Sequence, residues 1–195
     1  MAVVLQDFSW QRMIEAVEAV RERACRAAAA LERAGIPYAV AGGNAVAAWV
    51  ARVDRAAVRN TNDVDILVRR SDFAAVKLAL ESVGFEYHNI LDVDCFIDGP
   101  EGSPRDGVRL LFAGEKVRPT YAAPSADVSE AVAADDYQVL SLEALVRMKL
   151  NSFRDKDRMH LRDMLDVGII DGSWLPRLLP EHAERLQTLI DDPDG

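Results

Sequence analysis

The chain has 195 residues, half of them hydrophobic and 28% charged, which fits one globular domain, alone or with a small appendage. Its net charge of −9 argues against a basic surface that wraps long nucleic acid. No apolar run approaches the length of a membrane span, residues 1–6 lack the features of a signal peptide, and the two cysteines fit no metal spacing. We therefore expect a cytoplasmic protein that does not enter a membrane.

The first half of the chain is predicted to alternate between helices and strands. Apolar residues at three- and four-residue spacing indicate helices, and short apolar runs bounded by glycine, proline or polar residues indicate strands. In chain order these are a helix over 9–34, a strand over 38–41, a helix over 44–52, a strand over 63–68 and a helix over 71–83.

The second half begins with strands and ends with helices. Strands are predicted over 85–91, 93–97 and 108–113, an irregular segment over 114–136, and helices from residue 141 onward. This order predicts an α/β or α+β core over residues 1–137 with a helical C-terminal extension over 138–195.

Two glycines and two aspartates stand out in the first half. Gly42 and Gly43 follow a strand and precede a helix, so their backbone N–H groups can approach a phosphate at the helix N-terminus. Asp63 and Asp65 lie two apart in the next strand and therefore project from one face. Adjacent carboxylates repel, so the pair indicates a hard cation such as Mg²⁺, bound together with substrate phosphates. The alternative is a glycine turn and a surface strand with two solvated aspartates.

This combination resembles the polymerase-β-type nucleotidyltransferase superfamily, in which a hydrophobic-Gly-Gly/Ser turn precedes an Asp-x-Asp strand. The run Arg59-Asn60-Thr61-Asn62-Asp63-Val64-Asp65 is similar to the form found in the bacterial abortive-infection and toxin nucleotidyltransferases. In the C-terminal half, Lys149-Leu150, Arg154-Asp155-Lys156-Asp157 and Asp163 resemble the helical Lys-Leu…Arg-x-Lys-Asp…Asp-Leu segment of that branch. The likeness extends over residues 30–168 and implies a mixed sheet flanked by helices.

The resemblance also implies roles for the matched residues. Asp63 and Asp65 would hold Mg²⁺ at the nucleotide phosphates, the glycine turn would cradle the triphosphate, and Lys149 would point toward the phosphates. Arg59 and Thr61 would either contact phosphate or orient the acidic strand. The expected catalytic residues are Asp63, Asp65 and Lys149, and the expected nucleotide-binding residues are Gly42, Gly43, Asn44, Arg59, Thr61 and Lys156.

A third carboxylate is expected on a later strand of nucleotidyltransferases that transfer nucleotides. The strand that matches this position offers Arg109 instead. Asp94, on the preceding strand, has the right local pattern for a third metal ligand, and Asp106 lies nearby in a loop. The sequence leaves three alternatives: Asp94, Asp106 or no third ligand.

Lys149, Lys156 and Asp163 are spaced seven residues apart, so on one continuous helix they would lie on nearly the same face. Lys149 lies within an apolar run, which favours a functional role over a lysine that only extends to solvent from a core margin. The charged residues after it fit equally well a solvated face with helical ion pairs.

Two functions follow from these expectations. The first is Mg²⁺-dependent transfer of a nucleoside monophosphate group from an NTP to a hydroxyl of an RNA end, a protein or a small molecule. The second, favoured by Arg109, is a non-catalytic nucleotide-binding or interaction protein of a toxin–antitoxin or defence pair. A cognate antitoxin and a second copy of the chain are the candidate protein partners. An RNA end would need a local basic patch, for which the candidates are Arg52, Arg55, Arg59, Arg69 and Arg70.

Overall fold

The computed structural model describes residues 9–100 and 102–193. Residues 1–6, on which the expectation about a signal peptide rests, lie outside the described residues. The main helices are α1 (Trp10–Arg33), α2 (Gly42–Val50), α3 (Phe73–Glu81), α4 (Leu142–Ser152), α5 (Asp155–Asp166) and α6 (Pro180–Asp191). The strands are β1 (Tyr38–Ala41), β2 (Val64–Val68), β3 (Phe85–Ile90), β4 (Val93–Asp98), β5 (Val108–Phe112), β6 (Ala131–Ala133) and β7 (Gln138–Leu140).

The strands form one mixed sheet in the order β3-β4-β5-β2-β1-β7-β6. At its centre, β2 runs antiparallel to β1 and parallel to β5. Asp65 on β2 is the register partner of both Ala41 on β1 and Arg109 on β5. Because register partners point to the same face of a sheet, the end of β1, the acidic strand and Arg109 meet on one face.

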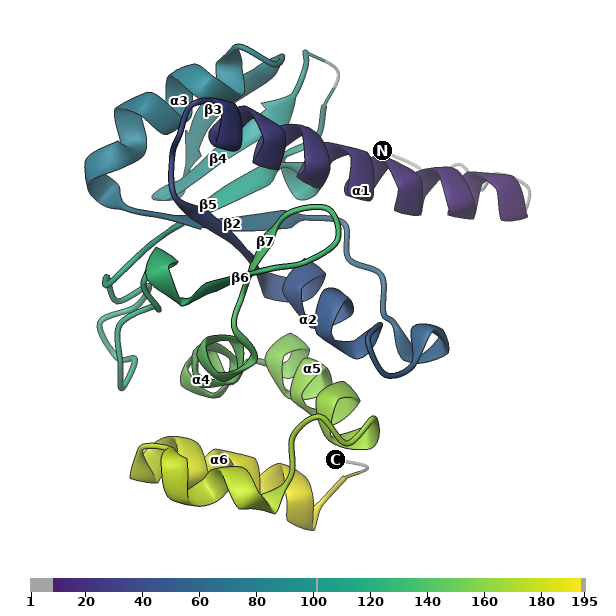
Figure 1. Ribbon diagram of the computed structural model, residues 1–195, viewed down its shortest axis with the longest axis vertical. Coiled ribbons are helices and arrows are strands. Elements are labelled where there is room, and N and C mark those ends of the chain that lie inside the picture. Colours follow the sequence, from purple (N-terminus) through teal and green to yellow (C-terminus); the bar gives the residue numbers. More distant parts are fainter. Residues whose placement is uncertain (1–8, 101, 194–195) are drawn as a thin grey trace.

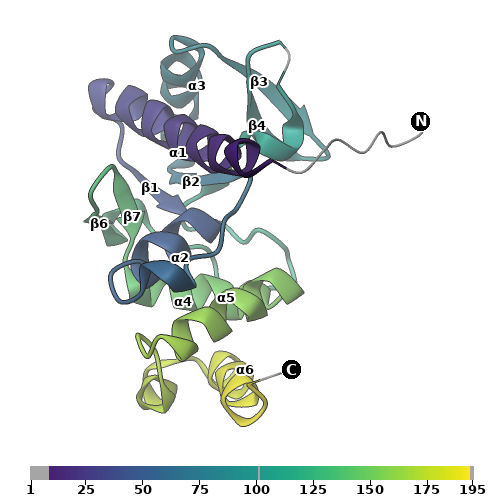
Figure 2. The same cartoon turned by 90° about the vertical axis from the view of Figure 1, so that its right-hand side faces the viewer.

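Helices cover both faces of the sheet. α1 and α3 lie on one face and α2 lies on the other, with α4 and α5 packed against α2 and α6 outermost (Figures 1 and 2). The part of α1 over the sheet buries small residues, Ala24, Ala27 and Ala28, which lets the helix approach closely. Its first turns extend past the sheet, so Trp10 and Met13 are exposed.

The C-terminal helices share one core with the sheet. Leu145, Leu161 and Leu186, from α4, α5 and α6, are buried in the same cluster as the central strand residues Val40 and Ile66. The predicted division at residue 137 stays a prediction about independent folding units. β7, which begins at the next residue, pairs with β1 inside the sheet.

Two features differ from the expectations. The segment expected to be irregular contains β6, which pairs with β7. These strands have three residues each and no clear alternation of polar and apolar residues, so only their long-range pairing defines them. The helix expected to carry Lys149 and Lys156 is not continuous, because Phe153 has a φ of 46° in the left-handed region and ends α4 before α5 begins.

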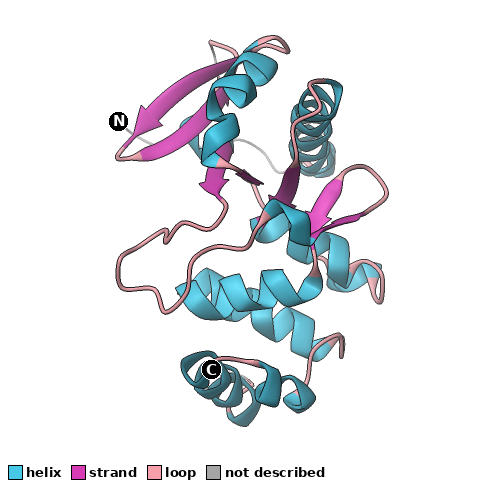
Figure 3. Ribbon diagram, turned by 60° about the vertical axis from the view of Figure 1, so that its left-hand side comes forward, coloured by secondary structure: helices cyan, strands magenta, loops and turns pink. Residues whose placement is uncertain are grey.

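The long connection between β5 and β6 runs beside the C-terminal helices (Figure 3). Asn151 on α4 holds it with both halves of its amide: Nδ2 donates to the Ala123 carbonyl at 2.7 Å, and Oδ1 accepts from the Ala123 N–H at 3.1 Å. Within the described ranges, no helix is long and apolar enough to cross a membrane.

The shared core predicts one cooperative unfolding transition. Replacing fully buried Leu161 on α5 by alanine removes packing from the shared core, and should lower the free energy of unfolding by about 2–5 kcal/mol. The measurement is urea unfolding followed by circular dichroism and by tryptophan fluorescence, and the two curves should coincide. Leu78→Ala, at a side chain 70% exposed, is the control and should change the stability by less than about 0.5 kcal/mol. Separate transitions for sheet and C-terminal helices would contradict a shared core.

Candidate nucleotide site

The turn between β1 and α2 requires glycine at residue 42 and leaves little room for a side chain at residue 43. Gly42 has a φ of +62°, and a Cβ added there would lie 2.0 Å from Asp65 Oδ2. A Cβ on Gly43 would lie 3.0 Å from Thr61 Oγ1. The bare backbone therefore lets the acidic strand lie directly against the N-terminus of α2, where unpaired N–H groups favour an anion.

Asp63 is held by groups from three other parts of the chain. Its Oδ1 accepts from Thr61 Oγ1 at 2.7 Å and from Lys156 Nζ at 3.2 Å, and its Oδ2 accepts from Arg109 Nη1 at 2.5 Å. Its backbone carbonyl accepts from Asn44 Nδ2 at 2.8 Å, which ties the start of α2 to the acidic strand. Burial opposes ionisation of Asp63, but the Thr61 hydrogen bond and the charges of Lys156 and Arg109 outweigh it and lower its pKa.

Asp65 differs from Asp63 in having no hydrogen-bond partner among the described residues. Burial, followed by the charge of Asp63, raises the pKa of Asp65 above its usual value. A carboxylate that is partly buried, near a like charge and without a hydrogen-bond donor gains from a cation placed beside it. Asp65 is thus the group in the pair that is free to accept one.

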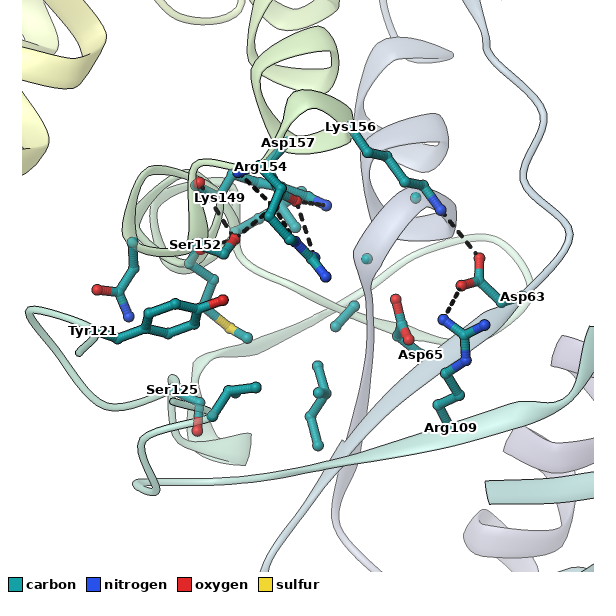
Figure 4. Close-up of a pocket in the computed structure, with 18 of the residues that line it drawn as sticks. Asp63, Asp65, Arg109, Tyr121, Ser125, Lys149, Ser152, Arg154, Lys156 and Asp157 are labelled. Atoms are coloured by element: carbon teal, nitrogen blue, oxygen red, sulfur yellow. Dashed lines mark hydrogen bonds and ion pairs between the residues drawn. The ribbon is translucent and has the colours of Figure 1, made fainter. Parts of the chain in front are cut away.

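A second charged cluster faces this pair from the C-terminal helices (Figure 4). Asp157, 1% exposed, accepts from Lys149 Nζ at 2.9 Å, Arg154 Nε at 2.8 Å and Ser152 Oγ at 2.7 Å. Burial opposes ionisation of Asp157, but Arg154, Lys149 and Ser152 outweigh it and hold its pKa well below the usual range. The break at Phe153 permits this geometry, because α4 ends there and Asp157 on α5 can contact Lys149 and Ser152 on α4.

These elements enclose one pocket of about 250 Å³. Gly42, Gly43, Asp63 and Asp65 line it from the sheet side, and Arg109 lines it from β5. Its basic residues are Arg109, Lys149, Arg154 and Lys156, and its carboxylates are Asp63, Asp65 and Asp157. Its apolar wall includes Val93, Leu111, Val117, Tyr121 and Met148.

The structure brings most of the expected residues together. The two glycines, the two aspartates, Lys149 and Lys156 all line the pocket, and Thr61 and Asn44 act on it through Asp63. Arg59 does not line the pocket, because its Nε pairs with both oxygens of Asp163 at 2.8 and 2.7 Å. That pair joins the loop before β2 to α5 and fits the orienting role.

Asp94 does not join the pair. Cys95, its neighbour on β4, is the register partner of Arg109, so Asp94 points to the opposite face of the sheet from Asp65. There it accepts from Tyr87 Oη at 2.8 Å and Asn89 Nδ2 at 3.0 Å. Asp106 lies in the short 3₁₀ helix before β5 and does not line the pocket. We do not retain either residue as a metal ligand.

Asp157 and Arg154 were not among the expected site residues, because the sequence fitted a solvated charged face as well as a functional one at these positions. Asp157 is among the least exposed carboxylates, and Arg154 and Ser152 both bind it. A signal was present: a lysine within an apolar run needs a buried partner, and the nearby carboxylates were the candidates. Tyr121, in the connection before β6, carried no such signal.

The donor set fits one magnesium ion held together with a nucleotide. Among residues 9–100 and 102–193, no three acidic, histidine or cysteine side chains lie close enough to form a metal cage. Mg²⁺, however, is commonly held by one or two carboxylates and the substrate phosphates. Asp65 is free for this, and Asp63 becomes available when Arg109 or Lys156 exchanges to a phosphate.

No protein-family model matches the chain, and no curated protein matches it. Several solved structures, however, match the fold of the chain. The solution structure of the antibiotic-resistance factor ANT(2″)-Ia superposes with a TM-score of 0.55 at 15% identity, over 90% of this chain and 91% of that one. The crystal structure of ANT(2″)-Ia in complex with adenylyl-2″-tobramycin gives 0.51 at 15% identity, over 94% and 98%.

An antigenic nucleotidyltransferase-like protein from Paracoccidioides brasiliensis gives a TM-score of 0.55 at 19% identity, over 92% of this chain and 91% of that one. The shared feature is the whole architecture, since each match spans nine-tenths of both chains. The chain has the nucleotidyltransferase fold, which confirms the predicted mixed sheet flanked by helices.

Proposed function

We propose that this chain binds a nucleoside triphosphate with Mg²⁺ and transfers the nucleoside monophosphate group to an acceptor, releasing pyrophosphate. The observation that carries the proposal is the meeting of three features in one pocket: a glycine turn at a helix N-terminus, an unpartnered carboxylate beside a second one, and a cluster of basic side chains opposite.

Each group has a role in this reaction. Asp63 and Asp65 hold the magnesium ion, which supplies positive charge at the transferred phosphorus and the leaving pyrophosphate. The N–H groups of Gly42 and Gly43 bind phosphate oxygens at the start of α2. Lys149 has three N–H donors, of which one binds Asp157, so the others are available to the pyrophosphate.

Arg154 and Lys156 complete the phosphate contacts. The side chain of Arg154 is 60% exposed and that of Lys156 is 46% exposed, so both can reorient onto a bound triphosphate. Charge neutralisation and positioning by preorganised groups supply most of the rate in such transfers. The apolar wall around Tyr121 and Met148 offers a surface for the base.

The acceptor is best supported as a small molecule. The arginines expected to form an RNA-binding patch are largely neutralised: Arg59 by Asp163, Arg69 by Asp127 and Arg70 by Glu115. ANT(2″)-Ia, whose crystal structure holds adenylyl-2″-tobramycin, is an example of the fold with a small-molecule acceptor. Partnership with an antitoxin, self-association and a cytoplasmic location stay predictions from the sequence.

Arg109 favours a second candidate, a nucleotide-binding protein that does not transfer. Its guanidinium is paired to Asp63 at the position where a third carboxylate is expected. In that case the NTP binds but no pyrophosphate is released with any acceptor. Pyrophosphate release in the presence of Mg²⁺, NTPs and an acceptor mixture separates the two candidates.

Asp65→Asn should abolish transfer while leaving the fold intact. The amide keeps the shape of the side chain but loses the charge that holds the cation, so pyrophosphate release should fall at least about 100-fold. Asp94→Asn removes a carboxylate from the opposite face of the sheet and is the matched control. An equal loss in both variants would contradict the assignment of the pair.

Gly42→Ala should weaken Mg²⁺-dependent NTP binding more than about tenfold, because its Cβ displaces the Asp65 carboxylate. The control is Gly99→Ala, which has a similar positive φ of +70° but no atom within 4 Å of the added Cβ. Both variants place alanine at a similar positive φ, so comparing them by calorimetric titration with a non-hydrolysable NTP separates the effect on the site from backbone strain. Unchanged binding by Gly42→Ala would remove the turn from the proposed site.

A further inference from the structure

We infer that the acceptor is a phosphate monoester rather than an alcohol, and that Arg109 is the residue that selects it. The inference rests on the proposed nucleotidyl transfer. The acceptor expected from the sequence is a hydroxyl group. The inferred acceptor is instead an anion whose oxygen is already deprotonated.

A basic side chain, Arg109, lies beside the aspartate pair. Arg109 is the register partner of Asp65 on the adjacent strand, so it stands where a third carboxylate would complete the acidic group. Its side chain is 38% exposed and lines the pocket. Of its five N–H donors, the described residues engage only those of Nη1, which binds Asp63. The rest of the guanidinium is available to a ligand.

The described residues of the pocket offer the acceptor no free general base. An alcohol must lose its proton as it attacks, and a positioned base normally takes it. Within the described part of the chain, no histidine lines the pocket. Asp157 is saturated by Lys149, Arg154 and Ser152, and the Asp63–Asp65 pair is assigned to the cation. No carboxylate among the described residues of the pocket is left over for the acceptor.

A phosphate monoester removes this requirement. It is largely dianionic at neutral pH, so an oxygen lone pair is ready to attack without proton removal. That oxygen forms a bond to the α-phosphorus of the NTP, and the bond from the α-phosphorus to its bridging oxygen breaks. Pyrophosphate leaves with the electron pair, and the product contains a new phosphoanhydride. Atoms and charge balance with no further reactant.

The position of Arg109 fits the acceptor side of the pocket. In Figure 4 it lies on the far side of Asp65 from Lys149 and Arg154, the residues that would hold the triphosphate. A planar guanidinium matches two oxygens of a phosphate at once, which is the geometry that arginine uses to bind this group. Arg109 would therefore bind the phosphate of the acceptor beside the NTP. Its positive charge would offset the repulsion between the two phosphorylated substrates.

The test compares matched acceptor pairs. The protein is incubated with Mg²⁺ and the four common NTPs, and pyrophosphate release is measured with glucose 1-phosphate against glucose, ribose 5-phosphate against ribose, and glycerol 3-phosphate against glycerol. Calorimetry with a non-hydrolysable NTP present measures binding of the same six compounds. We expect at least one phosphorylated member to bind and react about 10- to 100-fold better than its partner, the range of a hydrogen bond to a charged group.

Variants at position 109 identify the residue responsible. Arg109→Gln should bring the ratio between the members of a pair close to one, and Arg109→Lys should restore part of it. Arg109→Asp, which supplies the absent carboxylate, should shift the preference toward the alcohols. Arg105→Gln, at an exposed arginine on the same approach to β5 that does not line the pocket, is the control and should keep the wild-type ratio.

The outcomes separate the two proposals. If pyrophosphate is released with alcohols and not with phosphate monoesters, the inference is overturned while nucleotidyl transfer stands. If the NTP binds and no phosphate monoester binds or reacts, the inference is overturned as well. If neither NTP binding nor pyrophosphate release is found, the proposed function is wrong, and the inference that rests on it is wrong as well.

Discussion

The close approach of Asp65 to the backbone of Gly42 is the constraint on which the site depends. It follows from the antiparallel register of β1 and β2, which pairs Asp65 with Ala41 and brings the acidic strand against the N-terminus of α2. A side chain at residue 42 would occupy the position of the carboxylate. The turn therefore serves the fold and the site together, since the same absence of a Cβ lets the strands pair and leaves room for a phosphate.

Ion pairs then fix the C-terminal helices against the acidic strand. Lys149 and Asp157 are both buried, and leaving either without its partner would cost about 3–5 kcal/mol. The ion pair therefore fixes the position of α5 relative to α4. Lys156 joins the start of α5 to Asp63, and Arg59 joins the loop before β2 to Asp163. The helical extension is thus tied to the sheet through the ionic groups that line the pocket.

The sequence predicted the parts of this arrangement that depend on short spacing. The glycine turn, the acidic strand and most element types follow from local patterns, and the lysine within an apolar run marked Lys149. The sequence could not supply long-range pairing: the opposite-facing position of Asp94 depends on the register of β4 with β5, and the ion pair of Arg109 depends on that of β5 with β2. The break at Phe153 was also hidden, because that residue carries no common helix-stop signal.

A crystal structure with Mg²⁺ and a non-hydrolysable NTP tests the central claim most directly. The account predicts that the triphosphate lies at Gly42 and Gly43, that the metal contacts both Asp63 and Asp65, and that Lys149 and Arg154 reach the β- and γ-phosphates. It also predicts that Arg109 leaves Asp63 and faces the open side of the α-phosphate. A nucleotide bound away from the glycine turn, or a metal-free complex in which Arg109 still pairs with Asp63, would contradict it.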